Sequence, residues 1–162
     1  APLNIHEVLE RVRSVIVAEY PQGITVVRDY DTSLPDITGD REQLIQVVLN
    51  IVRNAAQAIA AAPPQGGGEI RLLTRVARSV TIARRLNRLA LELSVVDNGP
   101  GIAPPLLARV FHPLVSGRDG GTGLGLTLAQ NYVQHHGGFI DCESLPGRTT
   151  FRIILPLARA GK

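Results

Sequence analysis

Lysine, cysteine and tryptophan are almost absent from this chain of 162 residues. The single lysine is Lys162, so the sequence has neither the Gly-Lys-Ser/Thr ending of a P-loop nor a candidate for the invariant lysine of serine/threonine kinases. Cys142 is the single cysteine, which excludes an intrachain disulfide and favours a cytosolic chain in which this thiol is an inert, packed residue. Aromatic residues make up only 4% and tryptophan is missing, so we expect an aliphatic core.

Long hydrophobic runs and strong net charge are missing as well. No apolar run approaches membrane-spanning length, and no signal peptide opens the sequence, so we expect no membrane association. The formal net charge of +3 is too mild to argue for nucleic acid. The arginine-rich stretch from Arg71 to Arg88 contains no acid and no aromatic residue for base stacking, and we interpret it as the solvated face of a hairpin.

The length of the chain predicts one domain over residues 1–162, and its helix and strand patterns make this domain α+β. Helical spacing predicts helices over residues 5–20, 41–61 and 124–136, the first two opened by capping residues Asn4 and Asp40. Strand patterns are found at residues 24–30, 70–76, 89–97, 139–143 and 151–155, with a hairpin turn near residues 84–87. Strands with helices packed on one face imply a two-layer α/β sandwich.

A row of amide side chains lies on the long helix. Gln46, Asn50 and Asn54 are spaced four residues apart and therefore stack on one side, although most of their neighbours are apolar. Two explanations remain open: an intramolecular polar network, or a face that binds a ligand or metal. Amide oxygens are suitable ligands for Mg²⁺, which arrives attached to phosphates.

Asp97 stands where the 89–97 strand ends. Strand alternation gives it the parity of Leu91, Leu93 and Val95, so its carboxylate should point into the sandwich and needs hydrogen-bond donors. It could cap the turn that follows, or it could accept a hydrogen bond from the exocyclic amine of adenine. In the second case Gly99 and Gly101 would let a flat base approach the backbone.

The glycine-rich stretch from Gly120 to Leu126 runs directly into the third predicted helix. Backbone N–H groups of such a stretch, at a helix N-terminus, are suited to phosphate binding, although plain loops share this composition. In and before this stretch, Ser116, Arg118 and Thr122 could reach phosphate oxygens, and Phe111 would be an apolar plug.

Together these segments resemble the ATP-binding domain of sensor histidine kinases, in the wider superfamily with gyrase, Hsp90 and MutL. Asn50-Ile-Val-Arg-Asn54-Ala is similar to the asparagine box, and Asp97-Asn-Gly-Pro-Gly-Ile102 to the first glycine box. Phe111-His-Pro-Leu is similar to the phenylalanine box, and Gly121-Thr-Gly-Leu-Gly-Leu126 to the second glycine box. The segments at residues 28–35 and 115–126 resemble more specifically the nitrogen-regulation sensor kinases of the NtrB type.

This resemblance implies a Bergerat-type fold, a mixed sheet covered on one face by helices, with ATP between the layers. Asn54 would coordinate Mg²⁺ through the ATP phosphates, Asn50 would line the same pocket, Asp97 would bind adenine, and residues 103–120 would form the ATP lid. The other implied nucleotide contacts are Gly99, Gly101, Ile102, Phe111, Arg118, Gly121, Thr122, Gly123, Leu124, Gly125, Leu126 and Thr149. Thr149 shares a strand face with Phe151 and could help behind the adenine, although the second glycine common before this threonine is missing here.

The implied activity is that of a protein-histidine kinase, which donates the ATP γ-phosphoryl group to a histidine on a separate dimerisation domain. A response regulator would take the phosphoryl group from there, and a P-II signal protein could dock on the parent protein. ATP hydrolases of the superfamily carry a glutamate in place of Asn50, and an amide cannot take a proton at neutral pH. The site should therefore hold ATP without hydrolysing it efficiently, as a kinase requires.

The phosphoacceptor and sensor domains are expected to be absent from this chain. His6 lies too close to the asparagine box to leave room for a two-helix dimerisation hairpin, and we interpret it as a surface helix residue. The parent protein is expected to be a cytoplasmic homodimer and this domain a monomer that does not autophosphorylate. An anti-sigma-type serine kinase and a nucleotide-sensing module without transfer activity remain as alternatives.

Overall fold

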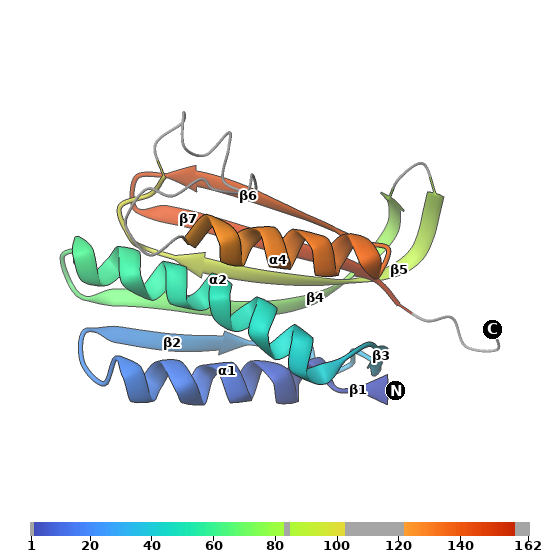
Figure 1. Cartoon of the computed structure of the whole chain (residues 1–162), viewed down its shortest axis with the longest axis horizontal. Coiled ribbons are helices and arrows are strands. Elements are labelled where there is room, and N and C mark those ends of the chain that lie inside the picture. The colour runs from blue at the N-terminus through green and yellow to red at the C-terminus, as the bar shows by residue number, and fades with distance from the viewer. Residues whose placement is uncertain (1, 83–84, 103–121, 158–162) are drawn as a thin grey trace.

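The computed structural model describes residues 2–82, 85–102 and 122–157 (Figure 1). Within these ranges, only the backbone is described for residues 79–82, 85–88 and 122–125. The elements in chain order are β1 (Pro2–Leu3), α1 (Ile5–Glu19), β2 (Ile24–Asp29), β3 (Ile37–Thr38), α2 (Arg41–Ala61), β4 (Gly68–Ile82), β5 (Arg85–Asp97), α4 (Thr122–His135), β6 (Phe139–Leu145) and β7 (Arg148–Pro156). The larger sheet has the order β2-β4-β5-β7-β6, and β1 pairs with β3 in a small separate sheet.

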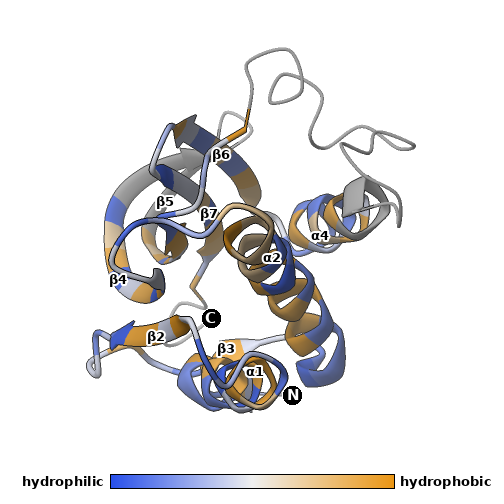
Figure 2. Ribbon diagram, turned by 90° about the vertical axis from the view of Figure 1, so that its left-hand side faces the viewer, coloured by the Kyte–Doolittle hydropathy of each residue, from blue (hydrophilic) through white to orange (hydrophobic). Residues whose placement is uncertain are grey.

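The larger sheet is mixed. β2 runs parallel to β4, whereas β4–β5, β5–β7 and β6–β7 are antiparallel. α1, α2 and α4 lie together on one side of this sheet, as the end-on view shows (Figure 2). The predicted α+β sandwich, with a mixed sheet covered on one face by helices, is therefore confirmed.

The predicted caps open the first two helices. The Asn4 side chain accepts a hydrogen bond from the backbone N–H of His6 at 2.8 Å, and the Asp40 side chain accepts one from Gln43 N–H at 3.1 Å. Each cap satisfies an amide that has no partner inside the helix. The Glu7 carboxylate contacts Arg41 at 3.2 Å and thereby links the first turns of α1 and α2.

α2 is the central helix of the core and corrects one prediction. Its 21 residues are long and apolar enough, by length and composition alone, to cross a membrane, although no such run was expected. Here the apolar side chains have another use, since Leu44, Val48 and Ile51 are almost fully buried inside the domain. A helix that packs against α1, α4 and the sheet needs more than one apolar side, which explains its composition.

The β4–β5 hairpin is longer than expected. Ile82 pairs with Arg85, so the connection falls at residues 83–84 and the predicted turn at 84–87 is wrong. The β-branched run from Val80 to Ile82 favours continued strand, and no glycine or proline interrupts it. β7 pairs with β5 only up to Ala90, which leaves Leu89 37% exposed although it has the parity of the buried Leu91.

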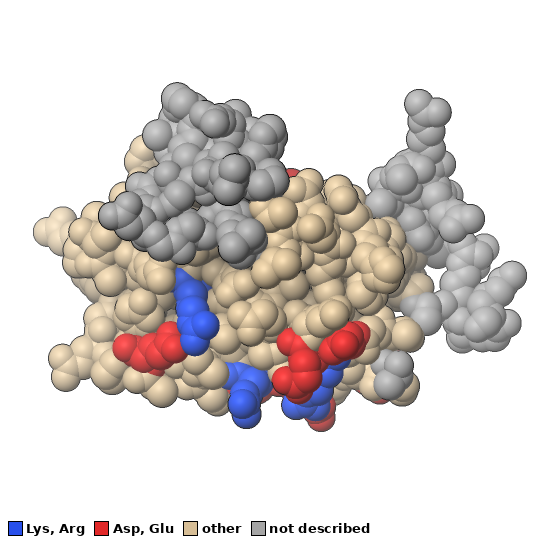
Figure 3. Space-filling view, viewed as in Figure 1, with Lys and Arg blue, Asp and Glu red and all other residues tan. Residues whose placement is uncertain are grey.

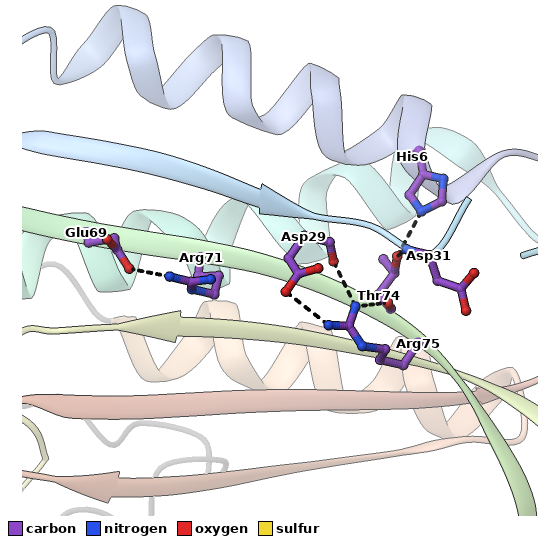
Figure 4. A network of polar contacts seen from close by, with 7 residues as sticks. All are labelled: His6, Asp29, Asp31, Glu69, Arg71, Thr74 and Arg75. Carbon is purple, nitrogen blue, oxygen red and sulfur yellow. Dashed lines mark hydrogen bonds and ion pairs between the residues drawn. The ribbon is translucent and has the colours of Figure 1, made fainter. Parts of the chain in front are cut away.

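His6 is not the surface residue that was expected. Its ring is half-buried, lies in hydrogen-bond contact with the Thr74 hydroxyl (Nε2 to Oγ1, 2.9 Å), and stacks on Tyr30 with ring centroids 4.6 Å apart. The same Thr74 oxygen accepts from the backbone N–H of Asp31 at 2.8 Å (Figure 4). Burial lowers the pKa of His6, against the opposing charges of Asp31 and Glu10. The sequence pattern shows a helix face but not what packs on it.

Charged side chains gather where α1 meets its neighbours. Arg53 holds Glu19 with two hydrogen bonds of 3.2 and 2.7 Å, which join α2 to α1. Figure 3 shows acidic and basic side chains next to one another over this region. On the opposite face of the sheet, Arg71 and Arg75 of the arginine-rich hairpin pair with Glu69 and Asp29, at 3.3 and 3.0 Å (Figure 4). The solvated-face interpretation therefore holds for these two arginines.

Candidate functional site

The predicted amide row lies along the accessible side of α2. Gln46 is exposed, and Asn50 and Asn54 are half-buried. The Gln46 side-chain amide donates to Asn50 Oδ1 at 3.2 Å, so part of the row is an internal network. Among the residues that the structure describes, none makes a hydrogen bond with the Asn54 amide. Within the described part of the chain, this amide oxygen therefore keeps its acceptor capacity.

The row continues by one more helical turn to Ala58, which meets the turn that follows β5. A Cβ placed on Gly99 would lie 3.7 Å from Ala58 Cβ and 3.5 Å from Ile59 Cγ1. Because residues four apart stack on one side of a helix, Asn54 lies one turn and Asn50 two turns N-terminal to this contact. α2 therefore brings the amides and the Asp97–Gly99 turn to one corner of the domain.

Asp97 is buried on the helix-covered face, as alternation predicts. It is 5% exposed, and its Oδ1 accepts a hydrogen bond from the Gly99 backbone N–H at 2.9 Å. Burial raises the pKa of this carboxyl to about 6, and the bond from Gly99 opposes the rise. The carboxyl does cap its turn, and its inward position also leaves it able to act as an acceptor for a ligand.

Thr149 faces Asp97 directly across β5 and β7, because the two residues are Cα partners in the ladder. It is 4% exposed and shares its strand face with the buried Phe151, as expected. The Asp97 carboxyl and the Thr149 hydroxyl thus lie side by side on the face of the sheet that the helices cover. Thr149 belongs to β7, whose start at Arg148 is three residues earlier than the predicted strand.

The first glycine box is fastened to the β6–β7 turn. Gly147 N–H donates to Gly99 O at 3.1 Å, and Ile102 N–H donates to the Ser144 hydroxyl at 2.7 Å. Gly101 has a φ of +91°, and a Cβ there would come within 2.7 Å of Leu145 O. In the described residues Gly101 therefore serves close packing against the protein's own backbone.

Sequence reasoning missed Ser144 and the role of Asn98. The Asn98 side chain accepts from Glu69 N–H at 2.8 Å and donates to Gly67 O at 3.1 Å, so it joins the end of β5 to the start of β4. Ser144 lies 2.7 Å from the Thr149 hydroxyl. Alternation backwards from Thr149 across a two-residue turn could have indicated Ser144, but the predicted strand ended at residue 143.

Several predicted site residues cannot be compared with the structure. Phe111, Ser116, Arg118, Gly121 and the expected lid at 103–120 lie outside the described residues. The backbone of Thr122, Gly123, Leu124 and Gly125 forms the first turn of α4, so the glycine-rich stretch does lead into a helix. Leu126 is buried in the core, which indicates a packing role.

The amide oxygens at this corner are suitable ligands for magnesium that is carried by a phosphate group. Asn50 and Asn54 supply neutral amide oxygens, which suit Mg²⁺ but cannot hold the ion alone. Among the described residues, no group of three or more histidine, cysteine or acidic side chains could form an independent metal site. A metal here would thus need most of its ligands from phosphate and water.

Comparisons with known proteins agree with this geometry. The model of the family described as histidine kinase-, DNA gyrase B- and HSP90-like ATPase matches residues 39–159. The sensory histidine kinase/phosphatase NtrB of Salmonella typhimurium is 49% identical over 156 residues, which are 96% of this chain and 44% of that protein. This chain thus spans less than half the length of that relative.

Solved structures of histidine kinases share the fold. A mycobacterial sensor histidine kinase, MprB, superposes with a TM-score of 0.75 at 26% identity, covering 97% of both chains. Full-length ShkA, solved in complex with AMPPNP, gives a TM-score of 0.78 at 26% identity over 100% of this chain and 32% of that one. The chain belongs to the family of histidine kinase-, DNA gyrase B- and HSP90-like ATPases.

Proposed function

We propose that this chain is the Mg-ATP-binding catalytic part of a sensor histidine kinase of the nitrogen-regulation type. One observation carries the proposal: the row of Asn50, Asn54 and Ala58 runs directly to Gly99, beside the buried carboxyl of Asp97. A base-binding acid and phosphate-side amides are thus held on adjoining elements. The similarity to NtrB and to the nucleotide-bound ShkA supports the same function.

In this proposal each end of the nucleotide meets its own group of residues. Asp97 accepts a hydrogen bond from the adenine amine, and Thr149 lies behind the base. The side-chain oxygen of Asn54 would coordinate magnesium carried by the phosphates, and Asn50 would line the same pocket. Magnesium neutralises phosphate charge and so makes the γ-phosphoryl group easier to transfer. Asn50 cannot act as a general base, so the site holds ATP without activating water against it.

The phosphoryl acceptor is proposed to be a histidine on a separate dimerisation domain, followed by a response regulator. A P-II protein is proposed as a regulator, and the parent protein as a cytoplasmic homodimer, on the resemblance to NtrB-type kinases. His6 is a poor acceptor candidate, because its ring is held between Thr74 and Tyr30.

Titration calorimetry with ATP and Mg²⁺, followed by a transfer assay, tests the proposal. We expect one ATP per chain and acid-labile label on an added NtrB-type phosphoacceptor domain, with no label on this chain alone. Stable phosphate on His6, or no binding of ATP, would contradict it. Acid-stable label on a serine of a partner would favour an anti-sigma-type kinase, and binding without transfer would favour a sensing module.

A further inference from the structure

Ser144 connects two parts of the candidate adenine site that are far apart in sequence. Its hydroxyl accepts the backbone N–H of Ile102, at 2.7 Å, where the first glycine box ends. The same oxygen lies 2.7 Å from the hydroxyl oxygen of Thr149, which is buried opposite Asp97. One half-buried side chain on β6 therefore contacts both the glycine box and the adenine-side threonine.

The hydrogen-bond capacity of a hydroxyl limits how this contact can be made. Serine has one O–H donor and two acceptor lone pairs. Ile102 N–H can only donate, so it occupies one lone pair of the Ser144 oxygen. The hydroxyl hydrogen of Ser144 remains free to donate. If that hydrogen goes to Thr149 Oγ1, the O–H of Thr149 is left to donate into the site. If Thr149 donates instead, its hydrogen is used up within the protein.

We propose that Ser144 is a positioning residue for adenine recognition, which donates to Thr149 and so directs the Thr149 hydroxyl hydrogen towards the bound base or its ordered water. This inference rests on the proposed ATP-binding function and adds a residue that acts through Thr149. The chain of bonds runs from Ile102 N–H through Ser144 to Thr149, and hydrogen bonds in such a chain polarise one another. It also fixes the end of the glycine box relative to the floor of the site.

Ser144→Ala removes both contacts with little change in volume. We expect ATP affinity to fall about fivefold to tenfold, the loss of a well-placed hydrogen bond. Ser144→Thr keeps the hydroxyl on a strand that accepts β-branched residues, and should restore affinity to within about twofold. Ser94→Ala, a buried serine on the other face of β5, is the matched control and should bind as the wild type does.

A double-mutant cycle with Thr149→Val separates positioning from general destabilisation. If Ser144 acts through Thr149, Ser144→Ala should cost no more than about twofold in the Thr149→Val background. Amide hydrogen exchange supplies a second readout without nucleotide, because Ile102 N–H should exchange faster in Ser144→Ala.

The outcomes separate this inference from the function on which it rests. Wild-type affinity in Ser144→Ala, or an undiminished effect in the Thr149→Val background, overturns the role of Ser144 and leaves ATP binding intact. Failure of the wild-type chain to bind ATP overturns both. Failure of Ser144→Thr to restore affinity also contradicts the proposal, because it would show that the hydroxyl is not what matters.

Discussion

Asp97 and Thr149 are Cα partners across β5 and β7, and both side chains are buried on the face that the helices cover. A carboxyl and a hydroxyl placed side by side in an aliphatic core are costly unless each has partners. Gly99 supplies one partner to Asp97 and Ser144 supplies one to Thr149. Both side chains can make further hydrogen bonds, as expected for buried groups that line a site for a polar ligand.

Asp97→Asn should separate binding from stability. The amide presents a donor where the adenine amine needs an acceptor, so ATP affinity should fall by about 1–3 kcal/mol, or roughly five- to more than a hundredfold. Calorimetry with ATP and Mg²⁺ measures this loss. Without nucleotide, the variant should be at least as stable as the wild type at pH 7.5, because it no longer buries an ionised carboxylate. Unchanged affinity would remove Asp97 from the site.

The pH dependence of Asp97 follows from its pKa of about 6 in the folded protein. This pKa is raised above the unfolded value, so its stabilising contribution is complete below about pH 4 and is lost as the pH rises through about 6. ATP binding needs the ionised acceptor and should behave in the opposite way, weakening as the pH falls from 7.5 to 5. The protein-dependent part of this trend should be absent in Asp97→Asn, which controls for titration of ATP itself.

Asn54→Ala should weaken the magnesium-dependent part of ATP binding. Alanine is a good helix former, so α2 should remain folded while one amide oxygen is lost. We expect affinity to fall about tenfold with Mg²⁺ and far less in a chelator. Gln57→Ala on an exposed position of α2 is the control and should bind as the wild type does. Equal losses with and without Mg²⁺ would assign Asn54 to another role.

His6 should contribute to stability in a pH-dependent way. Loss of its contact with Thr74 in His6→Gln should cost about 1 kcal/mol of unfolding free energy at pH 7.5. Because the pKa of His6 is lowered in the folded protein, its contribution is present above about pH 6.5 and declines as the pH falls below this value. Urea unfolding at pH 7.5 and 5.5 should therefore show a smaller difference between wild type and variant at the lower pH. His135→Gln, at an exposed position, is the control and should leave the free energy of unfolding at pH 7.5 nearly unchanged.

Local patterns in the sequence predict much of this architecture. The caps at Asn4 and Asp40, the amide row and the inward side chain of Asp97 depend on periods of about four residues or of two, which a single segment reveals. The parallel pairing of β2 with β4 and the partners of His6 depend on contacts between distant segments. Ser144 was missed for the same reason, since its role appears only when the β6–β7 turn meets the glycine box.

The parallel pairing of β2 with β4 makes α2 part of a crossover connection as well as the carrier of Asn50 and Asn54. Two parallel neighbours cannot be joined by a tight turn, so the sheet is complete only when this helix has been laid across it. Closing such a connection costs more loop-closure entropy than forming a local hairpin does. Asp97 lies on the β4–β5 hairpin, a local unit, whereas Asn50 and Asn54 reach the same corner through the crossover. The corner at which the ATP site is proposed is therefore complete only when this crossover connection has closed.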